Sequence, residues 1–261
     1  MTSNGRGLRL IGAIAAAALA AGAALAQTNP DDAVIDELVL ANHILADQSV
    51  LEGFGHVSAR SVKDPKHYYI AVAKAPGIVT RGDIVEFDEN SQPVKPDARQ
   101  FYSERYIHGE IYRSRADVKS VVHSHASPVL PFTVTKTPLK AMIHVAYFLG
   151  TEPAPVFEIR DAVGEKNAML VSDAKSGGAL AKVLGQRSVA LMRGHGMVVV
   201  GPTIKDSVFR AVYTQVNAQV ELEALKLGAP TFLNRFEVDR SEQVGRAWDN
   251  WALHVQAPGG R

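Results

Sequence analysis

The sequence predicts an α/β fold in which helices pack on a largely antiparallel sheet. Short segments rich in β-branched and aromatic residues follow one another without a regular helix between each pair. Helical patterns lie before, between and after these segments. The chain has 261 residues, 46% of them hydrophobic, which suffices for one substantial core and is too short for two large domains. A doubly wound parallel sheet, in which strands alternate with helices, fits this order less well.

The first part of the predicted domain holds one helix and three strands. Apolar residues at three- and four-residue steps predict the helix, at Val34, Leu38, Ala41 and Leu45. Two aspartates just before it can cap its start, and it is expected to end near Gly53. Residues 56–60, 68–73 and 83–87 are short, rich in Val, Ile and aromatic residues, and separated by turn residues. Each of them therefore predicts a strand.

The middle of the chain continues with helix and strand. Ser103 can cap a helix that runs to about Arg113, and residues 118–123 predict a buried strand. A Pro-rich loop region separates this strand from a second stretch of helix and strand, which begins near Ala168. Two apolar strands, residues 189–192 and residues 197–200, follow in that stretch.

The last predicted helix is the longest. Thr203-Ile204-Lys205-Asp206 resembles a capping box, and the helix is expected to continue to about Leu227, where Gly228 and a proline stop it. We therefore place one domain at residues 27–230 and a C-terminal tail at residues 231–261. The two tryptophans of this tail either pack against the domain or cover the pocket of a neighbouring subunit.

The first 26 residues predict a secretory signal peptide. Arg6 and Arg9 precede an uncharged, Ala-rich run, which closes on Ala24-Leu25-Ala26 before a polar sequence. A permanent transmembrane helix needs about 20 strongly apolar residues, so a retained anchor is the less favoured alternative. We expect cleavage near Ala26-Gln27, a secreted or periplasmic mature protein, and no membrane attachment of that mature form.

Composition excludes several classes of protein. The 28 Lys and Arg residues nearly balance the 27 Asp and Glu residues, so we expect no nucleic acid partner. Because the chain has no cysteine, disulfides, thiolate nucleophiles and cysteine-ligated zinc are excluded. The nine histidines are therefore the first candidates for functional residues.

Two of the histidines lie at the end of a predicted strand, in Val121-Val122-His123-Ser124-His125. Residues two apart on a strand point to the same face, so His123 and His125 are expected to project together. They are either two metal ligands or two strand histidines satisfied by hydrogen bonds, and such spacing also arises by chance.

A third histidine, His195, lies between two glycines directly after a predicted strand. The missing side chains allow a tight turn that presents the imidazole at the edge of the sheet. Three neutral imidazoles with an open position are typical of a catalytic divalent metal site. Zinc is the first choice, and manganese, iron or another divalent metal is the alternative, because imidazole suits several of them.

Glu104 and His108 share one face of a predicted helix, four residues apart. Exposed pairs of this kind are frequent and weak, so one interpretation is a surface ion pair. The other makes Glu104 a general acid/base beside the metal, with a proton affinity raised by partial burial.

Several blocks in the same order make the sequence resemble the class II aldolase/adducin family from about Leu38 to Leu227. The blocks are Gly55-His56-Val57-Ser58, Ser103-Glu104, residues 115–125 and Arg193-Gly194-His195-Gly196-Met197. The resemblance implies a three-layer α/β/α sandwich, often assembled as a tetramer with the site between neighbouring subunits. It also implies that His123, His125 and His195 are the metal ligands and that Glu104 is the catalytic acid/base.

One block departs from the sugar-phosphate enzymes of that family. Those enzymes carry an Asn after the first glycine and a Thr/Ser-Gly turn, which together cradle a phosphate. Here His56 follows Gly55, and the turn reads Lys74-Ala75-Pro76-Gly77, in which Pro76 removes a hydroxyl and an N–H. A sugar phosphate is therefore disfavoured as substrate. The runs at residues 55–60, 107–112 and 191–196 resemble those of the decarboxylase-type members, which act on hydroxylated aromatic acids. We expect Gly55, His56 and Ser103 to contact substrate, with a packing role as the alternative for His56.

His144 lies in an apolar run at residues 142–148. It either lines the substrate pocket or serves as a buried hydrogen-bonding residue.

The resemblance implies a metal-dependent carbon–carbon lyase that decarboxylates a hydroxylated aromatic acid through a metal-stabilised enolate or phenolate. The first alternative is a retro-aldolase or epimerase that acts on a nonphosphorylated hydroxy-carbonyl compound. The second is a noncatalytic, adducin-like interaction domain. The expected partners are a small-molecule substrate and further copies of the chain in a homotetramer.

Overall fold

The computed structural model describes Met1, residues 29–239 and residues 243–256. The predicted signal peptide and its cleavage site lie outside these residues. The strands are β1 (His56–Arg60), β2 (His67–Ala71), β3 (Ile84–Asp88), β4 (Ser120–Ser124), β5 (Val156–Phe157), β6 (Val189–Met192) and β7 (Gly196–Gly201). The α-helices are α1 (Asp32–Asp47), α2 (Arg105–Ser114), α3 (Leu130–Val134), α4 (Ile159–Val163), α5 (Ala174–Leu184), α6 (Ile204–Leu227) and α7 (Val244–Gln256). Three short 3-10 helices complete the fold, η1 (Pro76–Ile78), η2 (Arg81–Asp83) and η3 (His144–Leu149).

The strands form one mixed sheet in the order β3-β2-β1-β4-β7-β6-β5. Every neighbouring pair is antiparallel except β5 and β6, which are parallel. In the register of the central strands, His123 of β4 lies opposite His56 of β1 on one side and Val198 of β7 on the other. The largely antiparallel sheet predicted from the sequence is confirmed.

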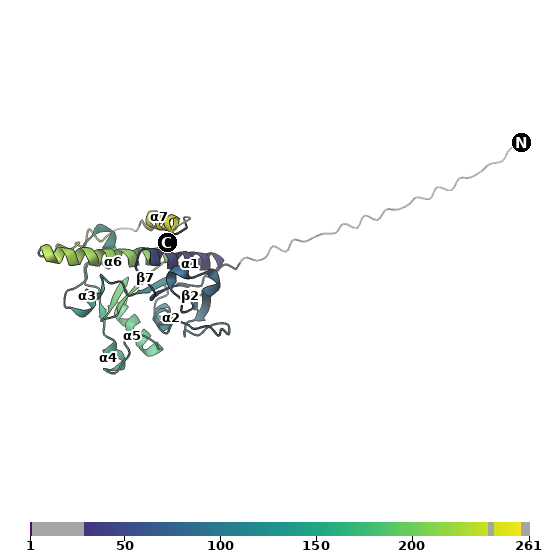
Figure 1. Cartoon of the computed structure of the whole chain (residues 1–261), viewed down its shortest axis with the longest axis horizontal. Coiled ribbons are helices and arrows are strands. Elements are labelled where there is room, and N and C mark those ends of the chain that lie inside the picture. The colour runs from purple at the N-terminus through teal and green to yellow at the C-terminus, as the bar shows by residue number, and fades with distance from the viewer. Residues whose placement is uncertain (2–28, 240–242, 257–261) are drawn as a thin grey trace.

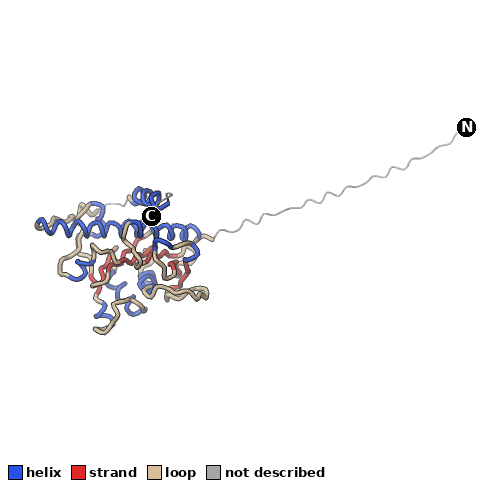
Figure 2. Tube along the Cα trace, in the orientation of Figure 1, coloured by secondary structure: helices blue, strands red, loops and turns tan. Residues whose placement is uncertain are grey.

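Helices cover both faces of the sheet (Figures 1 and 2). Helices α1 and α6 lie along one face, and α2, α4 and α5 lie on the other. Each face has its own apolar core, because alternate strand residues such as Val122 and Val121 point to opposite sides and pack into different clusters. The three-layer α/β/α arrangement is therefore confirmed.

Two predicted helix starts differ from the structure. The α2 helix begins at Arg105 with Glu104 as its N-cap residue, so Ser103 does not cap it. The N-cap of α1 is Asp31, but its carboxylate makes no cap hydrogen bond and accepts hydrogen bonds from Ser61 and Tyr69 instead. In α1, tertiary contacts have taken the side chain that the local pattern assigned to capping, whereas in α2 the cap position lies one residue later than predicted and Ser103 is exposed.

The long helix α6 begins and ends as predicted. The Thr203 hydroxyl accepts a hydrogen bond from the Asp206 backbone N–H at 3.1 Å, and Gly228 is the C-cap residue. Four polar side chains of α6 are fully buried, namely Ser207, Thr214, Asn217 and Glu221. The last two bind the chain that leads to η3, because Asn217 and Glu221 accept hydrogen bonds from the backbone N–H groups of Met142 and Lys140, respectively.

The predicted tail, residues 231–261, contains a helix that was not predicted from the sequence. Helix α7 lies over α6 and α1, and its Trp248 and Trp251 are buried in the core on that side of the sheet. Both tryptophans therefore pack within their own chain. Within the described part of the chain, every helix is too short or too polar to cross a membrane.

Candidate metal centre

Three histidines from two sheet positions converge on one point. His123 is the fourth residue of β4 and is fully buried, His125 follows the end of this strand, and His195 lies in the turn between β6 and β7. The Nε2 atom of His125 lies 3.0 Å from the Nε2 atom of His123 and 3.0 Å from that of His195. The structure therefore brings these three side chains together, as predicted from the sequence.

Backbone carbonyls fix the orientation of two of the rings. His123 Nδ1 lies 3.1 Å from the carbonyl oxygen of Met197, and His195 Nδ1 lies 2.8 Å from that of Met169. A carbonyl oxygen only accepts, so each Nδ1 carries a proton and donates it. In the neutral rings, the two Nε2 atoms therefore present lone pairs toward His125, the pattern of metal-ligating histidines.

Hydrogen bonding within the cluster does not satisfy these lone pairs. A neutral His125 has at most one N–H at Nε2 and can serve only one of the two neighbouring acceptors. Strand histidines linked by hydrogen bonds would therefore need a protonated ring beside the Glu104 carboxylate, whereas one cation shared by the three nitrogens would bind all these lone pairs.

Glu104 completes the cluster from the N-terminal end of α2. Its Oε2 atom lies 3.4 Å from His123 Nε2 and 3.4 Å from His195 Nε2. Its Oε1 atom accepts a hydrogen bond from the Val171 backbone N–H at 2.9 Å, which holds the carboxylate in place. The four ligand atoms lie within 4.8 Å of one another.

The spacing and chemistry of these donors fit a divalent metal ion. Tetrahedral zinc with Zn–N distances of about 2.0–2.1 Å holds its ligand atoms about 3.3 Å apart. The cluster shows 3.0 Å between nitrogens and 3.4 Å between nitrogen and carboxylate oxygen. Imidazole and carboxylate ligands are shared by sites for zinc, iron and manganese, so the donor set leaves the element open.

The charge of Glu104 differs from the sequence prediction. Burial alone would raise the pKa of Glu104, but the adjacent His123 and His195 lower this pKa below its ordinary value. Burial also lowers the pKa of His195, yet the Glu104 carboxylate outweighs this effect and raises it. The predicted rise in the proton affinity of Glu104 is therefore wrong. The ionised carboxylate favours a positive charge at the centre of the cluster.

Two glycines let the backbone approach closely enough to build this centre. A Cβ atom on Gly196 would lie 2.1 Å from the carbonyl oxygen of Ser124, so only glycine allows β7 to pair with the end of β4. Gly55 has a φ of +85°, and a Cβ atom there would lie 2.9 Å from the carbonyl oxygen of His123. Gly55 therefore places the start of β1 against His123 of the cluster.

His56 lies beside the cluster and is almost fully buried. Its ring centroid is 5.1 Å from that of His123 and 4.6 Å from that of Tyr102. Its Nδ1 atom is 2.6 Å from His108 Nε2. Burial lowers the pKa of His56 well below its usual value and that of His108 to about 3, with smaller contributions from neighbouring histidines, so both rings are neutral.

The interpretation of Glu104 and His108 as a surface ion pair is wrong. Both side chains are buried, and His108 binds His56 and Ser58 rather than Glu104. The i, i+4 spacing predicted one helical face for both, but Glu104 belongs to the irregular cap of α2 and turns toward His123 and His195.

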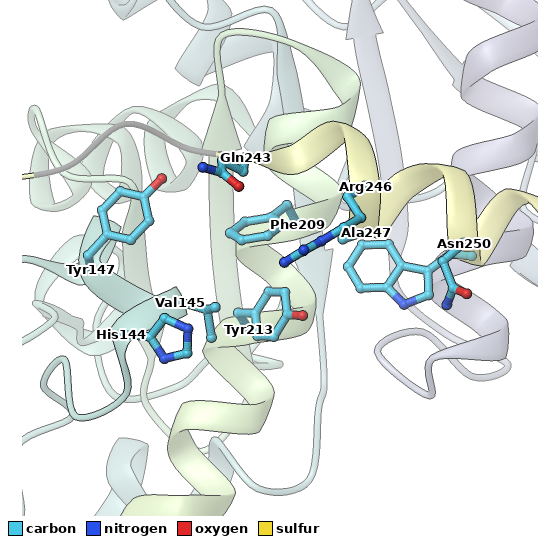
Figure 3. Close-up of a pocket in the computed structure, with 10 residues that line it drawn as sticks. His144, Val145, Tyr147, Phe209, Tyr213, Gln243, Arg246, Ala247 and Asn250 are labelled. Carbon is cyan, nitrogen blue, oxygen red and sulfur yellow. The ribbon is translucent and has the colours of Figure 1, made fainter.

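Ser103 and His144, the remaining residues predicted to contact substrate, lie in different places relative to the histidine cluster. Ser103 is exposed and directly precedes Glu104. His144 is also exposed and lines a cavity of about 420 Å³ between η3, α6 and α7 (Figure 3). None of the four cluster residues lines this cavity. The alternative of a buried structural histidine is therefore wrong for His144.

Two aromatic residues beside the centre, Phe54 and Tyr102, were not predicted from the sequence. Phe54 has 76% of its surface exposed, and its ring centroid lies 6.5 Å from that of His125. Both residues line a small cavity of about 90 Å³. Tyr102 contacts the ring of His56. The signal for Phe54 was present in the turn Gly53-Phe54-Gly55, where an aromatic residue between two glycines has little to pack against.

Residues 36–222 match the family described as Class II Aldolase and Adducin N-terminal domain, so the chain belongs to this family. Among curated relatives, Decarboxylase tropJ of Talaromyces stipitatus is 35% identical over 245 residues, which cover 83% of this chain and 92% of that protein. The 3,4-dihydroxyphthalate decarboxylase of Arthrobacter keyseri is 23% identical over 209 residues, which cover 74% of this chain and 79% of that protein.

Solved structures share the fold. The L-fuculose 1-phosphate aldolase from Glaciozyma antarctica aligns with a TM-score of 0.68 and 20% sequence identity, covering 85% of this chain and 89% of that one. The predicted family membership and architecture are therefore confirmed, and the named relatives include decarboxylases.

Proposed function

We propose that this protein is a divalent-metal-dependent carbon–carbon lyase that removes CO2 from a hydroxylated aromatic acid. The observation that carries the proposal is the convergence of three imidazole Nε2 atoms and the Glu104 carboxylate at the end of β4, beside the buried His56. Two relatives named as decarboxylases, one of them for 3,4-dihydroxyphthalate, support the reaction and the substrate class.

His123, His125 and His195 would hold the metal ion, with zinc as the first choice. When bound, a divalent ion supplies Lewis-acid stabilisation of the negative charge that develops next to the reacting carbon. The carbonyls of Met197 and Met169 keep two of the rings in the tautomer that binding requires.

Glu104 moves the proton in this proposal. Because its carboxylate is ionised, Oε2 first accepts the proton of a substrate hydroxyl. The bond between the ring carbon and the carboxylate then breaks, its electron pair stays on the ring carbon, and CO2 leaves. Glu104 delivers its proton to that carbon, and the product hydroxyl takes one proton from water. His56 contacts the departing carboxylate or the ring.

The turn at Pro76 favours a substrate without a phosphate. A phosphate cradle needs free backbone N–H groups and hydroxyls. In this chain the corresponding segment forms η1, with a buried Pro76 that has no N–H to offer. This observation supports an aromatic or other nonphosphorylated acid over a sugar phosphate.

Metal analysis and product analysis of two variants test the proposal. We expect stoichiometric metal in the wild type and in Glu104→Gln, loss of metal in His123→Ala, and loss of CO2 release in both variants. Released aldehyde in place of CO2 would support the retro-aldolase alternative. A purified wild type without metal would support the interaction domain, and full activity in either variant would refute the assigned roles.

We also propose that the mature chain begins near Gln27, acts in the periplasm or outside the cell, and forms a homotetramer. The basis is the Arg-containing, Ala-rich N-terminal segment and the family's frequent assembly as tetramers. N-terminal sequencing of the exported protein and light scattering of the purified protein test these two points.

A further inference from the structure

A chain of buried side chains leads away from the metal centre, starting at His56. His56 Nδ1 lies 2.6 Å from His108 Nε2, and His108 Nδ1 lies 2.6 Å from Ser58 Oγ. Ser58 Oγ lies 2.7 Å from the Tyr112 hydroxyl oxygen. All four side chains are buried, and they come from β1 and α2. We refer to this set as the His56 chain.

Counting protons gives the His56 chain a single direction. Within the described residues, the proton of the Tyr112 hydroxyl has one acceptor, Ser58 Oγ. The Ser58 proton must then go to His108 Nδ1, because two protons cannot occupy one hydrogen bond. The opposite direction would leave the proton of the buried Tyr112 hydroxyl without an acceptor, at a cost that native structures rarely bear.

The direction continues through His108 to His56. An imidazole ring carries at least one N–H, so a ring that accepts a hydrogen bond at one nitrogen carries its proton on the other. Because His108 Nδ1 accepts from Ser58, its proton is on Nε2, and this group donates to His56 Nδ1. The proton of His56 is then on Nε2.

The Nε2 atom of His56 is the free end of the chain. It has no hydrogen-bond partner among the described residues, and it is not fully buried although the residue as a whole is only 3% exposed. The ring lies in contact with His123. Because Nδ1 is occupied by His108, an N–H at Nε2 is the group of this ring that remains available to a ligand bound beside His123.

We propose that His108, Ser58 and Tyr112 are positioning residues that hold His56 as the Nε2–H tautomer, so that His56 is a fixed hydrogen-bond donor to an acceptor oxygen of the substrate. This inference rests on the proposed function for the identity of that oxygen, a carboxylate oxygen of the aromatic acid. The inference also narrows the substrate class. The substrate group beside His56 must accept a hydrogen bond, because a group that only donates cannot pair with the His56 N–H.

The surroundings keep the chain from rearranging. The Tyr68 ring stacks on His108 at an interplanar angle of 14°, and the Arg60 guanidinium lies 4.7 Å from the centroid of the Tyr112 ring. Arg60 also donates hydrogen bonds to the backbone carbonyls of Tyr112, Arg115 and Val118. The rings therefore have little freedom to flip and reverse the hydrogen bonds.

Nitrogen NMR of the zinc-loaded protein tests the tautomer directly. In protein labelled with 15N-histidine, long-range 1H–15N correlations distinguish Nε2–H from Nδ1–H, and the signals lost in His56→Gln identify His56. We expect the Nε2–H form for His56 in the wild type. The Nδ1–H form would overturn the proposal, and this measurement requires no turnover, so it is independent of whether the protein releases CO2.

Ser58→Ala tests the role of the chain, with Ser120→Ala as its matched control. Ser120 is equally buried in the adjacent strand β4 but lies outside the His56 chain. Removing Ser58 Oγ takes the donor away from His108 Nδ1, so we expect the Nδ1–H form of His56 to become detectable in Ser58→Ala and to stay undetected in Ser120→Ala. Tautomer populations that are the same in both variants would refute the positioning role.

Ligand binding tests the donor function of His56 itself. We use 2,3-dihydroxybenzoate as the probe and calorimetry as the readout, with zinc-loaded protein. Because a hydrogen bond to a charged oxygen is lost, His56→Met should bind about tenfold more weakly or worse. His56→Gln, which keeps an N–H donor, should recover most of this loss. Equal binding by His56→Met and the wild type would refute a donor role.

Discussion

Glu221 makes the stability of this protein sensitive to pH near neutrality. Its side chain is fully buried in α6, and its Oε2 atom accepts one hydrogen bond from the Lys140 backbone N–H at 3.2 Å. Its Oε1 atom has no hydrogen-bond partner among the described residues. Burial raises the pKa of Glu221 from 4.5 to about 7, although the Lys140 N–H and charge oppose the rise.

The sign of the effect follows from the protons bound in each state. Between pH 4.5 and about 7, the native state binds the proton of Glu221 more tightly than the unfolded state does, so stability falls as pH rises through this window. At about 1.36 kcal/mol per pH unit, the complete loss is about 3.4 kcal/mol. Glutamine keeps the acceptor oxygen and carries no charge, so Glu221→Gln removes this loss.

Denaturant unfolding at pH 5 and pH 8.5 measures the difference. We expect Glu221→Gln to stabilise the protein by about 2.5 kcal/mol more at the higher pH than at the lower, because most of the titration lies between these values. Glu223→Gln is the matched control, since Glu223 is exposed on the same helix, and it should show little such change. An effect of Glu221→Gln that is equal at both pH values would refute the reasoning.

Three further substitutions give measurable outcomes. Gly196→Ala places a Cβ atom 2.1 Å from the Ser124 carbonyl oxygen, so we expect about 3 kcal/mol of destabilisation and lower metal content, read by denaturant unfolding and metal analysis; wild-type values would contradict this. Arg60→Lys loses the planar fork that binds four backbone carbonyls, and calorimetric unfolding should show a loss of about 3 kcal/mol. Because Phe54 is exposed, Phe54→Ala should leave the melting temperature nearly unchanged. Because the Phe54 ring lies beside His125, the same substitution should raise KM for aromatic acids several-fold. An unchanged KM would exclude this contact.

Local patterns sufficed to predict much of the sheet and the cluster of histidines. Period-2 alternation placed His123 and His125 on one face, and the paired glycines around His195 predicted a tight turn at the sheet edge. Both features depend on a few neighbouring residues, and the structure brings these three side chains together as expected.

Features set by distant contacts were beyond local reasoning. The ionisation of Glu104 depends on His123 and His195, which reach it only after β4 and β7 have paired. The same is true of His108, whose partner His56 is 52 residues away in the sequence. Helix α7 was missed although Val244, Trp248, Trp251 and Val255 recur at three- and four-residue steps, and its burial is determined by the surfaces of α6 and α1.

The pairing of His56 with His123 across β1 and β4 separates two parts of the centre that can evolve independently. Strand register fixes which residue of β1 stands beside the ligand, whatever its side chain is. A substitution at position 56 can therefore change which reactant group is accepted while the three nitrogen ligands stay in place. Proteins that share this sheet can then come to catalyse different reactions through few mutations, provided that the register of β1 with β4 is preserved.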